Sequence, residues 1–156
     1  MATNGSIRKD ILDYIDKAPL ATLATVRAEG APALRTIAAF AQTDGGKTIY
    51  FLSGPGADKT HQIAANANVA FLIQHEGQEL AKFRNVAVNG IAKPVTAQSE
   101  LERAAALLAP RSPYVKDRLE KEGFGAFAFY HVTATEVKFL DYSKGIGPSA
   151  VETIKV

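Results

Sequence analysis

The sequence predicts a mainly β fold, an antiparallel barrel of about six strands with peripheral α-helices. Extended segments rich in β-branched and aromatic residues follow one another with short turns between them, and helical patterns interrupt them at few points. The chain has 156 residues, of which 47% are hydrophobic, and shows no internal repeat. A single core suffices at this length, so we expect one domain over residues 1–156.

The first third of the chain predicts one helix and three strands. Ser6 can cap an amphipathic helix that ends before Pro19, which makes residues 1–19 an N-terminal helical segment. Turn residues at Glu29-Gly30 and at residues 43–46 divide the sequence that follows. We therefore expect strands at residues 20–28, 33–42 and 47–53.

The remaining sequence alternates short helices with strands. A glycine-rich break at Gly54 precedes a helix over residues 58–66. Ser99 and Glu102 match a capping box for a second helix, which ends at Pro110. We expect strands at residues 69–75, 80–96 (bent at Gly90), 124–133 and 135–142, helices at 101–109 and 113–122, and a C-terminal tail at 143–156.

Composition and charge exclude several classes of function. The chain has 18 basic and 16 acidic residues, a formal charge of +2, which argues against nucleic acid as the main partner. It contains no cysteine, so it has no disulfide, thiolate nucleophile or cysteine-ligated metal. No secretory signal or run of about 20 apolar residues occurs, so we expect a cytoplasmic protein without membrane contact.

The segment that follows the third strand predicts an anion site. It runs from Ser53 through a glycine loop to Lys59 and Thr60 at the start of a helix. Unpaired N–H groups at a helix N-terminus attract anions, and a lysine in the first turn adds charge, so phosphate is the expected ligand. Asp58 stands before the lysine, where a Walker A loop needs glycine. The alternative is an ordinary strand-to-helix turn with a solvated lysine.

Arg35 is the second candidate anion ligand. It is the one large cation in the otherwise apolar strand segment from Ala33 to Ala39. A buried charge without a partner is costly, so this side chain either binds an anion beside Ser53 and Lys59 or lies on the outer face of an edge strand.

The other chemistry-bearing residues favour structural roles. The three histidines, His61, His75 and His131, lack the spacing of a metal site, so we expect no bound metal. No G-x-S-x-G motif occurs, which argues against a serine hydrolase. The aromatic stripe at residues 124–130 is typical of a core, and stacking on a planar ligand is the alternative.

Several of these segments, in order, resemble the pyridoxamine 5′-phosphate oxidase-like flavoproteins. The matching segments are residues 20–32 (LATLATVRAEGAP), Arg35-Thr36, residues 49–53 (IYFLS), Lys59-Thr60, residues 68–71 (NVAF) and residues 84–90 (RNVAVNG). The last of these is similar to the family's R-Q-V-x-V-x-G segment. The resemblance covers about half of the chain and implies a split β-barrel that forms a homodimer and binds FMN in two clefts between the subunits.

The resemblance also implies which residues bind the cofactor. The strand that begins at Arg35 would lie along the flavin ring and ribityl chain, while Arg35, Ser53 and Lys59 would bind the phosphate. Asn85 stands where the family often has glutamine, and would contact the cofactor held by the other subunit. The implied cofactor-binding residues are Arg35, Thr36, Ile37, Ala38, Leu52, Ser53, Lys59, Thr60 and Asn85.

The resemblance implies an FMN-dependent oxidoreductase that acts on a small substrate. In true pyridoxamine phosphate oxidases a C-terminal segment supplies arginine and histidine to the substrate, whereas the last arginine here is Arg118. We therefore expect the flavin site without the vitamin reaction. The alternatives are a non-catalytic flavin carrier, sensor or electron-transfer module, or a version of the fold that binds deazaflavin or haem. For haem, one of the three histidines would ligate iron.

Overall fold

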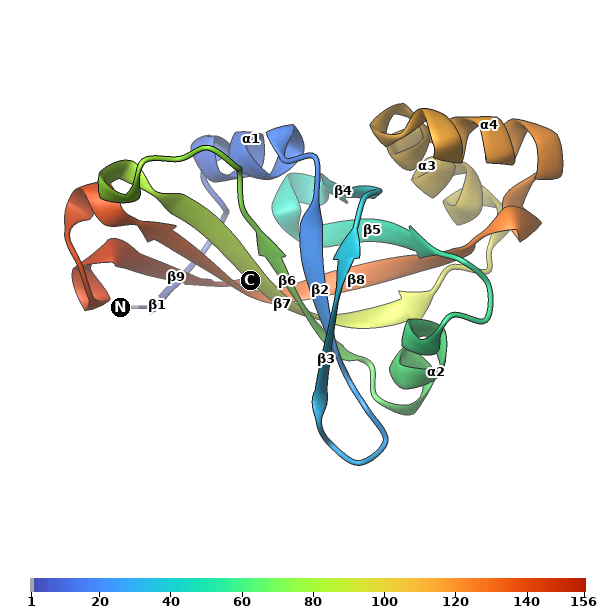
Figure 1. The fold of residues 1–156 in the computed structure, drawn as a ribbon, viewed down its shortest axis with the longest axis horizontal. Coiled ribbons are helices and arrows are strands. Elements are labelled where there is room, and N and C mark those ends of the chain that lie inside the picture. Colours follow the sequence, from blue (N-terminus) through green and yellow to red (C-terminus); the bar gives the residue numbers. More distant parts are fainter. Residues whose placement is uncertain (1) are drawn as a thin grey trace.

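The computed structural model describes residues 2–156 and confirms a mainly β, largely antiparallel fold with peripheral helices (Figure 1). One sheet contains all the strands. They are β1 (Ala2–Asn4), β2 (Ala21–Val26), β3 (Pro32–Ile37), β4 (Phe40–Thr43), β5 (Thr48–Ser53), β6 (Asn68–Ile73), β7 (Arg84–Pro94), β8 (Ala128–Asp141) and β9 (Val151–Lys155). The helices are α1 (Lys9–Lys17), α2 (Asp58–Ala65), α3 (Gln98–Leu108) and α4 (Pro113–Glu122).

The sheet curls into a barrel that is open between β3 and β4. The strands pair in the order β3-β2-β6-β7-β8-β5-β4, so β3 and β4 end this path and do not pair with each other. The 14-residue strand β8 pairs with β7 along one edge. Along its other edge it pairs with β5 and then with β9. This shared strand extends the sheet beyond the barrel.

Within residues 2–156 the sheet has nine strands rather than about six, because β1 and β9 were not predicted as strands, and two further strand boundaries differ. The segment predicted as one strand over residues 33–42 is interrupted at Ala38 and Ala39, which lie outside the ladders of β3 and β4. Conversely, the strands predicted at 124–133 and 135–142 merge into the single strand β8, which begins only at Ala128, because pairing with β7 continues past Ala134 with only a local bulge at Thr135.

The predicted C-terminal tail is wrong for its last residues. Within the segment 143–156, Val151–Lys155 forms β9, which pairs with β8 and buries Ile154 in the barrel core. Residues 2–4 pair in parallel with β9. This short terminal segment becomes a strand through long-range pairing with β8 and β1.

Four helices lie at the predicted places, but the predicted N-terminal helical segment 1–19 also contains strand β1, and two predicted caps are wrong. The N-cap of α1 is Arg8 rather than Ser6, and α3 follows Ala97, so Ser99 lies inside the helix. Only α4 among these helices has a side-chain cap, in which Ser112 accepts a hydrogen bond from the amide of Val115. None of the helices within residues 2–156 is long and apolar enough to cross a membrane.

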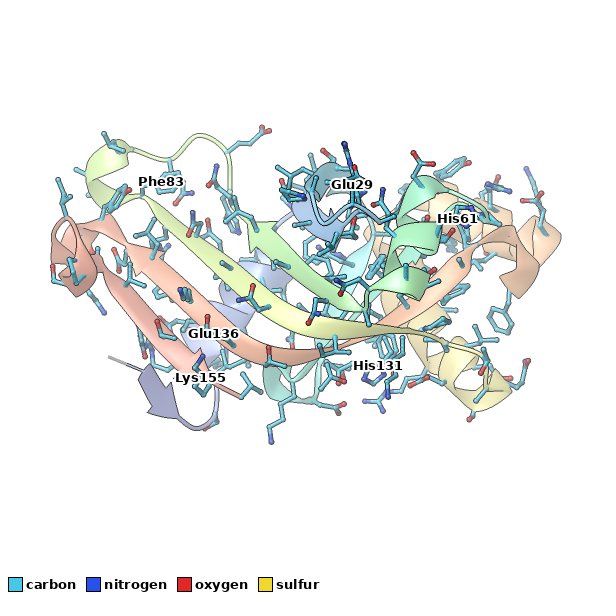
Figure 2. The ribbon with its side chains drawn as sticks, turned by 90° about the horizontal axis from the view of Figure 1, so that it is seen from below. Glu29, His61, Phe83, His131, Glu136 and Lys155 are labelled. Atoms are coloured by element: carbon cyan, nitrogen blue, oxygen red, sulfur yellow. The ribbon has the colours of Figure 1, made fainter. Side chains whose placement is uncertain are left out.

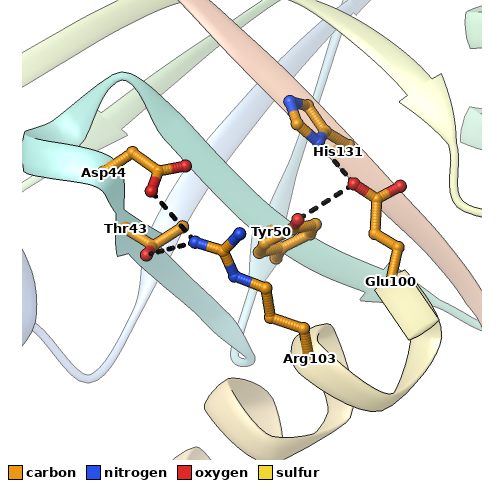
Figure 3. A network of polar contacts seen from close by, with 6 residues as sticks. All are labelled: Thr43, Asp44, Tyr50, Glu100, Arg103 and His131. Atoms are coloured by element: carbon orange, nitrogen blue, oxygen red, sulfur yellow. Dashed lines mark hydrogen bonds and ion pairs between the residues drawn. The ribbon is translucent and has the colours of Figure 1, made fainter.

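Two apolar cores lie on opposite faces of β5. Ile49 and Phe51 face the barrel interior, whose end is closed by α1, while Tyr50 and Leu52 pack under α3 and α4. Polar contacts also hold α3 to the sheet (Figure 3). A carboxylate oxygen of Glu100 lies 3.0 Å from both the Tyr50 hydroxyl and His131 Nδ1. Both faces of β5 are therefore covered.

Gly90 lies at the bulge between β7 and β8, where a side chain has no room. A Cβ at this position would lie 2.6 Å from the carbonyl oxygen of Thr133 and from a methyl carbon of Val132. We expect Gly90→Ala to destabilise the protein by about 1–3 kcal/mol, because a backbone oxygen cannot move aside. Urea unfolding measures this, with Gly125→Ala as control, since nothing lies within 4 Å of a Cβ there. Equal unfolding midpoints for both variants would contradict the expectation.

Candidate functional site

A cavity of about 700 Å³ lies beside the β2–β3 hairpin and α2. Its lining includes Glu29 of the hairpin and His61 of α2, which are labelled in Figure 2. Small-molecule sites commonly have volumes of about 300–1,000 Å³. Its lining residues are Arg27, Ala28, Glu29, Ala33, Leu34, Arg35, Asp58, Lys59, His61 and Gln62. Three basic side chains and two carboxylates therefore share one cavity.

Arg35 is part of this cavity and has only neutral hydrogen-bond partners. Its Nη1 donates to the hydroxyl of Thr25 at 2.7 Å, and its Nη2 donates to Oε1 of Gln62 at 2.8 Å. Burial lowers the pKa of Arg35, an effect that Asp58 opposes and the nearby charge of Arg27 reinforces. The predicted alternative of a solvated arginine on the outer face is therefore wrong, because the side chain is half-buried and turned toward α2.

Lys59 projects from the first turn of α2 into the same cavity. Burial lowers the pKa of Lys59, repulsion from Arg35 lowers it further, and Asp58 acts in the opposite direction. Within the described part of the chain, neither Lys59 nor Arg35 forms an ion pair. The two cations repel each other, and an anion between them would relieve this repulsion.

The N-terminus of α2 adds backbone donors to these two side chains. Its N-cap residue, Ala57, has no side chain that could accept a hydrogen bond from the first turn. The loop before it turns at Gly56, whose φ of +75° is a conformation that glycine adopts readily. Amide groups of the first helical turn therefore remain available to an anion.

Sequence reasoning missed Thr25 and Gln62. Gln62 Oε1 also accepts a short hydrogen bond from the Thr25 hydroxyl, so the two side chains and Arg35 form one hydrogen-bonded cluster. Gln62 follows Lys59 by three residues and therefore shares its helix face, which the sequence could have indicated. Thr25 could be found only from the strand register. Arg35 pairs with Leu23, and Thr25 follows Leu23 by two residues on the same face of β2.

Ser53 and Thr60, predicted as phosphate ligands, have local hydrogen bonds instead. Ser53 is 3% exposed, and its hydroxyl donates to the carbonyl of Gly54 at 3.0 Å. The Thr60 hydroxyl donates to the carbonyl of Ala57 at 2.6 Å. Neither residue lines the cavity, although both flank the loop that leads to it. Their role toward a ligand stays a prediction.

The other predicted residues lie outside the cavity. Thr36 lies on the opposite face of β3 from Arg35, whereas Ile37 is buried in the barrel core. Ala38 lies in the gap between β3 and β4, and Leu52 packs under α3. The amide of Asn85 on β7 donates to Gln74 at 3.3 Å. Whether these five contact a cofactor stays a prediction.

Among the three histidines, only His61 lines the cavity. His75 stacks on Tyr14 at a ring distance of 3.9 Å, and its Nε2 lies 2.8 Å from the carbonyl oxygen of the same residue. His131 contacts Glu100. No group of three or more histidine and acidic side chains within residues 2–156 could hold a metal ion.

The comparison with protein families identifies the chain's relatives. Residues 7–141, most of the chain, match the family described as pyridoxamine 5′-phosphate oxidase. The chain belongs to the pyridoxamine 5′-phosphate oxidase family. The predicted resemblance is thereby confirmed over a longer stretch than the motifs that suggested it. A search of curated proteins found no match.

Solved structures share the fold of this family member at low sequence identity. A conserved hypothetical protein from Mycobacterium tuberculosis is 21% identical, with a TM-score of 0.74 over 92% of this chain and 90% of that one. The haem storage protein HutZ from Vibrio cholerae is 19% identical, with a TM-score of 0.66 over 83% and 91%. An FAD-binding protein from Mesorhizobium loti is 15% identical, with a TM-score of 0.65 over 85% and 94%.

Proposed function

We propose that this member of the family binds FMN and acts as a flavin-dependent oxidoreductase on a small substrate. The observation that carries the proposal is the pairing of Arg35 and Lys59 in one cavity, beside the uncapped N-terminus of α2 and without carboxylate partners in ion pairs. A family whose members use flavin supplies the ligand class, and the cavity supplies a matching anion site.

The donor set fits a phosphate monoester. Such a group carries a charge of about −1.5 to −2 at neutral pH and has three acceptor oxygens. The Arg35 guanidinium can bind two oxygens at once, and the Lys59 ammonium supplies a compact charge. Asp58 and Glu29 line the same cavity and reduce its positive potential. The phosphate would therefore be bound close to Arg35 and Lys59.

The flavin ring, when bound, supplies the redox chemistry by accepting or donating electrons. This chain would bind and orient it. The main-chain groups of Ala38 lie outside both neighbouring ladders, so they can form hydrogen bonds with a planar heterocycle. Ile37 is 4% exposed and Leu52 is 9% exposed, so their contacts with the ring would come mainly from the backbone.

The uncovered outer face of the sheet supports the proposal of a homodimer. Alternate residues of β2, β3 and β6 point away from the barrel core, and no helix covers them (Figure 1). Leu34 is 71% exposed and Leu72 is 39% exposed on this face. Exposed apolar side chains grouped on one face mark a protein interface. We propose that a second copy covers it and that Asn85 serves the partner's cofactor.

One observation favours haem as a second candidate ligand. His61 lines the cavity, and the haem storage protein HutZ has the same fold. Neutral imidazole is a common iron ligand. However, a haem site needs a large apolar surface, whereas this cavity is lined by charged side chains from both sides.

The visible absorption spectrum of the purified protein, before and after addition of FMN, tests the proposed function. We expect a yellow protein or saturable binding of added FMN, with FMN identified as the chromophore released on denaturation. Reduction of the bound flavin without turnover of any screened substrate would favour a carrier or sensor. A haem spectrum lost in His61→Ala would replace the proposal, and a colourless protein that ignores FMN would refute it.

A further inference from the structure

The Arg35 guanidinium is held from one side by other residues of the chain. Its Nη1 donates to the Thr25 hydroxyl at 2.7 Å and to the carbonyls of Leu23 and Ala33 at 3.3 and 3.4 Å. Its Nη2 donates once, to Gln62 Oε1 at 2.8 Å. Two strands and one helix therefore fix the plane and the position of this group.

Along one edge of the Arg35 guanidinium, the N–H groups have no hydrogen-bond acceptor among the described residues. An arginine has five N–H groups, one on Nε and two on each terminal nitrogen. Among the residues that the structure describes, nothing accepts a hydrogen bond from Nε of Arg35, and Nη2 has used one of its two. The Nε–H and the remaining Nη2–H form a fork whose spacing matches two oxygens of a phosphate or carboxylate.

A hydrogen bond between Thr25 and Gln62 fixes the two side chains that accept hydrogen bonds from Arg35. The Thr25 hydroxyl donates to Gln62 Oε1, so the lone pairs of the hydroxyl oxygen are available to Arg35. Gln62 Oε1 accepts hydrogen bonds from both Thr25 and Arg35. Thr25 is 2% exposed, which leaves its hydroxyl no competing water. The linked hydrogen bonds among Thr25, Gln62 and Arg35 favour one arrangement of the guanidinium.

We propose that Thr25 and Gln62 are positioning residues, which orient Arg35 so that its free Nε–Nη2 edge binds a phosphate monoester. The proposal rests on the proposed function and adds a ligand preference. A flavin that carries the phosphate gains this fork, whereas riboflavin, which lacks the phosphate, does not. The ratio of FMN affinity to riboflavin affinity therefore reports the orientation of Arg35.

The test compares Thr25→Val with Thr25→Ser by titration with FMN and with riboflavin. Valine keeps the shape of threonine without the hydroxyl, and serine keeps the hydroxyl. We expect Thr25→Val to weaken FMN binding about tenfold and to change riboflavin binding less than about twofold, since one hydrogen bond to a charged group is lost. Thr25→Ser should restore most of the FMN affinity. Gln62→Met, which lacks the acceptor oxygen, should reproduce the loss from the helix side.

A double-mutant cycle with Arg35→Gln separates positioning from a general effect on folding. If Thr25 acts through Arg35, Thr25→Val should have almost no further effect on FMN binding in the Arg35→Gln background. Two results would overturn the proposal: Thr25→Val weakens FMN and riboflavin binding equally, or it weakens FMN binding just as much in the Arg35→Gln background. In both cases the wild-type protein still binds FMN, so the proposed function would stand. A wild-type protein that binds neither flavin would refute the proposed function, and this proposal with it.

Discussion

Arg35→Gln should weaken FMN binding by about 10-fold to 150-fold, the equivalent of about 1.5–3 kcal/mol for hydrogen bonds to a charged group. The substitution removes the cation and keeps a polar but shorter side chain. Loss of Arg35 also removes a repulsive charge from Lys59, so the measured loss is the net of both effects. Isothermal titration, or quenching of flavin fluorescence, measures the affinity.

Matched variants show whether the effect is local. Lys116→Gln on α4 changes the net charge by the same amount at an exposed position outside the cavity, and we expect it to leave FMN affinity unchanged. Asp58→Asn removes a carboxylate from the cavity and should act in the opposite direction, toward tighter binding. If Arg35→Gln and Lys116→Gln have equal effects, the cavity is not the phosphate site.

The cavity also predicts how FMN affinity depends on pH. Burial and Arg35 lower the pKa of Lys59, so its ammonium loses its proton at a lower pH than an ordinary lysine does. As the pH rises through this pKa, the positive charge is lost and FMN affinity should fall. The same titration of Lys59→Ala should start from a weaker affinity and lack this alkaline decline.

Leu34→Asp should convert the proposed dimer into monomers. In an interface with two-fold symmetry, each substitution occurs twice. Full burial of one leucine stabilises the dimer by at least about 1.5 kcal/mol. The dissociation constant of the dimer should therefore rise at least about 100-fold, and the buried carboxylates would increase the effect. Analytical ultracentrifugation over a range of concentrations measures this constant.

The position of Leu34 makes the expected effect specific. It lies directly across from Ala24 on β2, which in turn lies across from Ala70 on β6, so a leucine projects beside a row of small residues. Tyr114→Asp on α4 introduces the same charge at a side chain that is 63% exposed and far from this row, and it should not change the association state. A Leu34→Asp variant that remains a dimer would locate the interface elsewhere. Leu34 also lines the cavity, so FMN affinity should fall in this variant even without loss of the dimer, and the association state is the readout that tests the interface.

Local patterns predicted the parts of the site that lie close together in the sequence. The strand, the glycine loop and the helix that carries Lys59 form a continuous segment, and each of them has a strong local signal. The unusual charge in an apolar strand singled out Arg35. Both residues line the same cavity, as the two separate arguments predicted.

Long-range pairing determines what the sequence did not reveal. Thr25 reaches Arg35 because β2 and β3 pair in one particular register, and a shift of one residue would turn it to the opposite face. Similarly, β9 is a strand because β8 extends beyond the barrel and offers it an edge. Ser53 was predicted as a phosphate ligand, but its position at the end of a strand covered on both faces buries it.

The double burial of β5 also affects the cost of binding. The loop that leads to α2 begins at the end of this strand, which is buried along its whole length, and α2 is anchored by Ile63. Only residues 54–57 lie between the two, and a hydrogen bond from the amide of Ala57 to the carbonyl of Gly54 closes the turn. Such a short, restrained loop has little backbone entropy to lose when an anion arrives. Binding energy from the phosphate would therefore be retained as affinity rather than spent on ordering the loop.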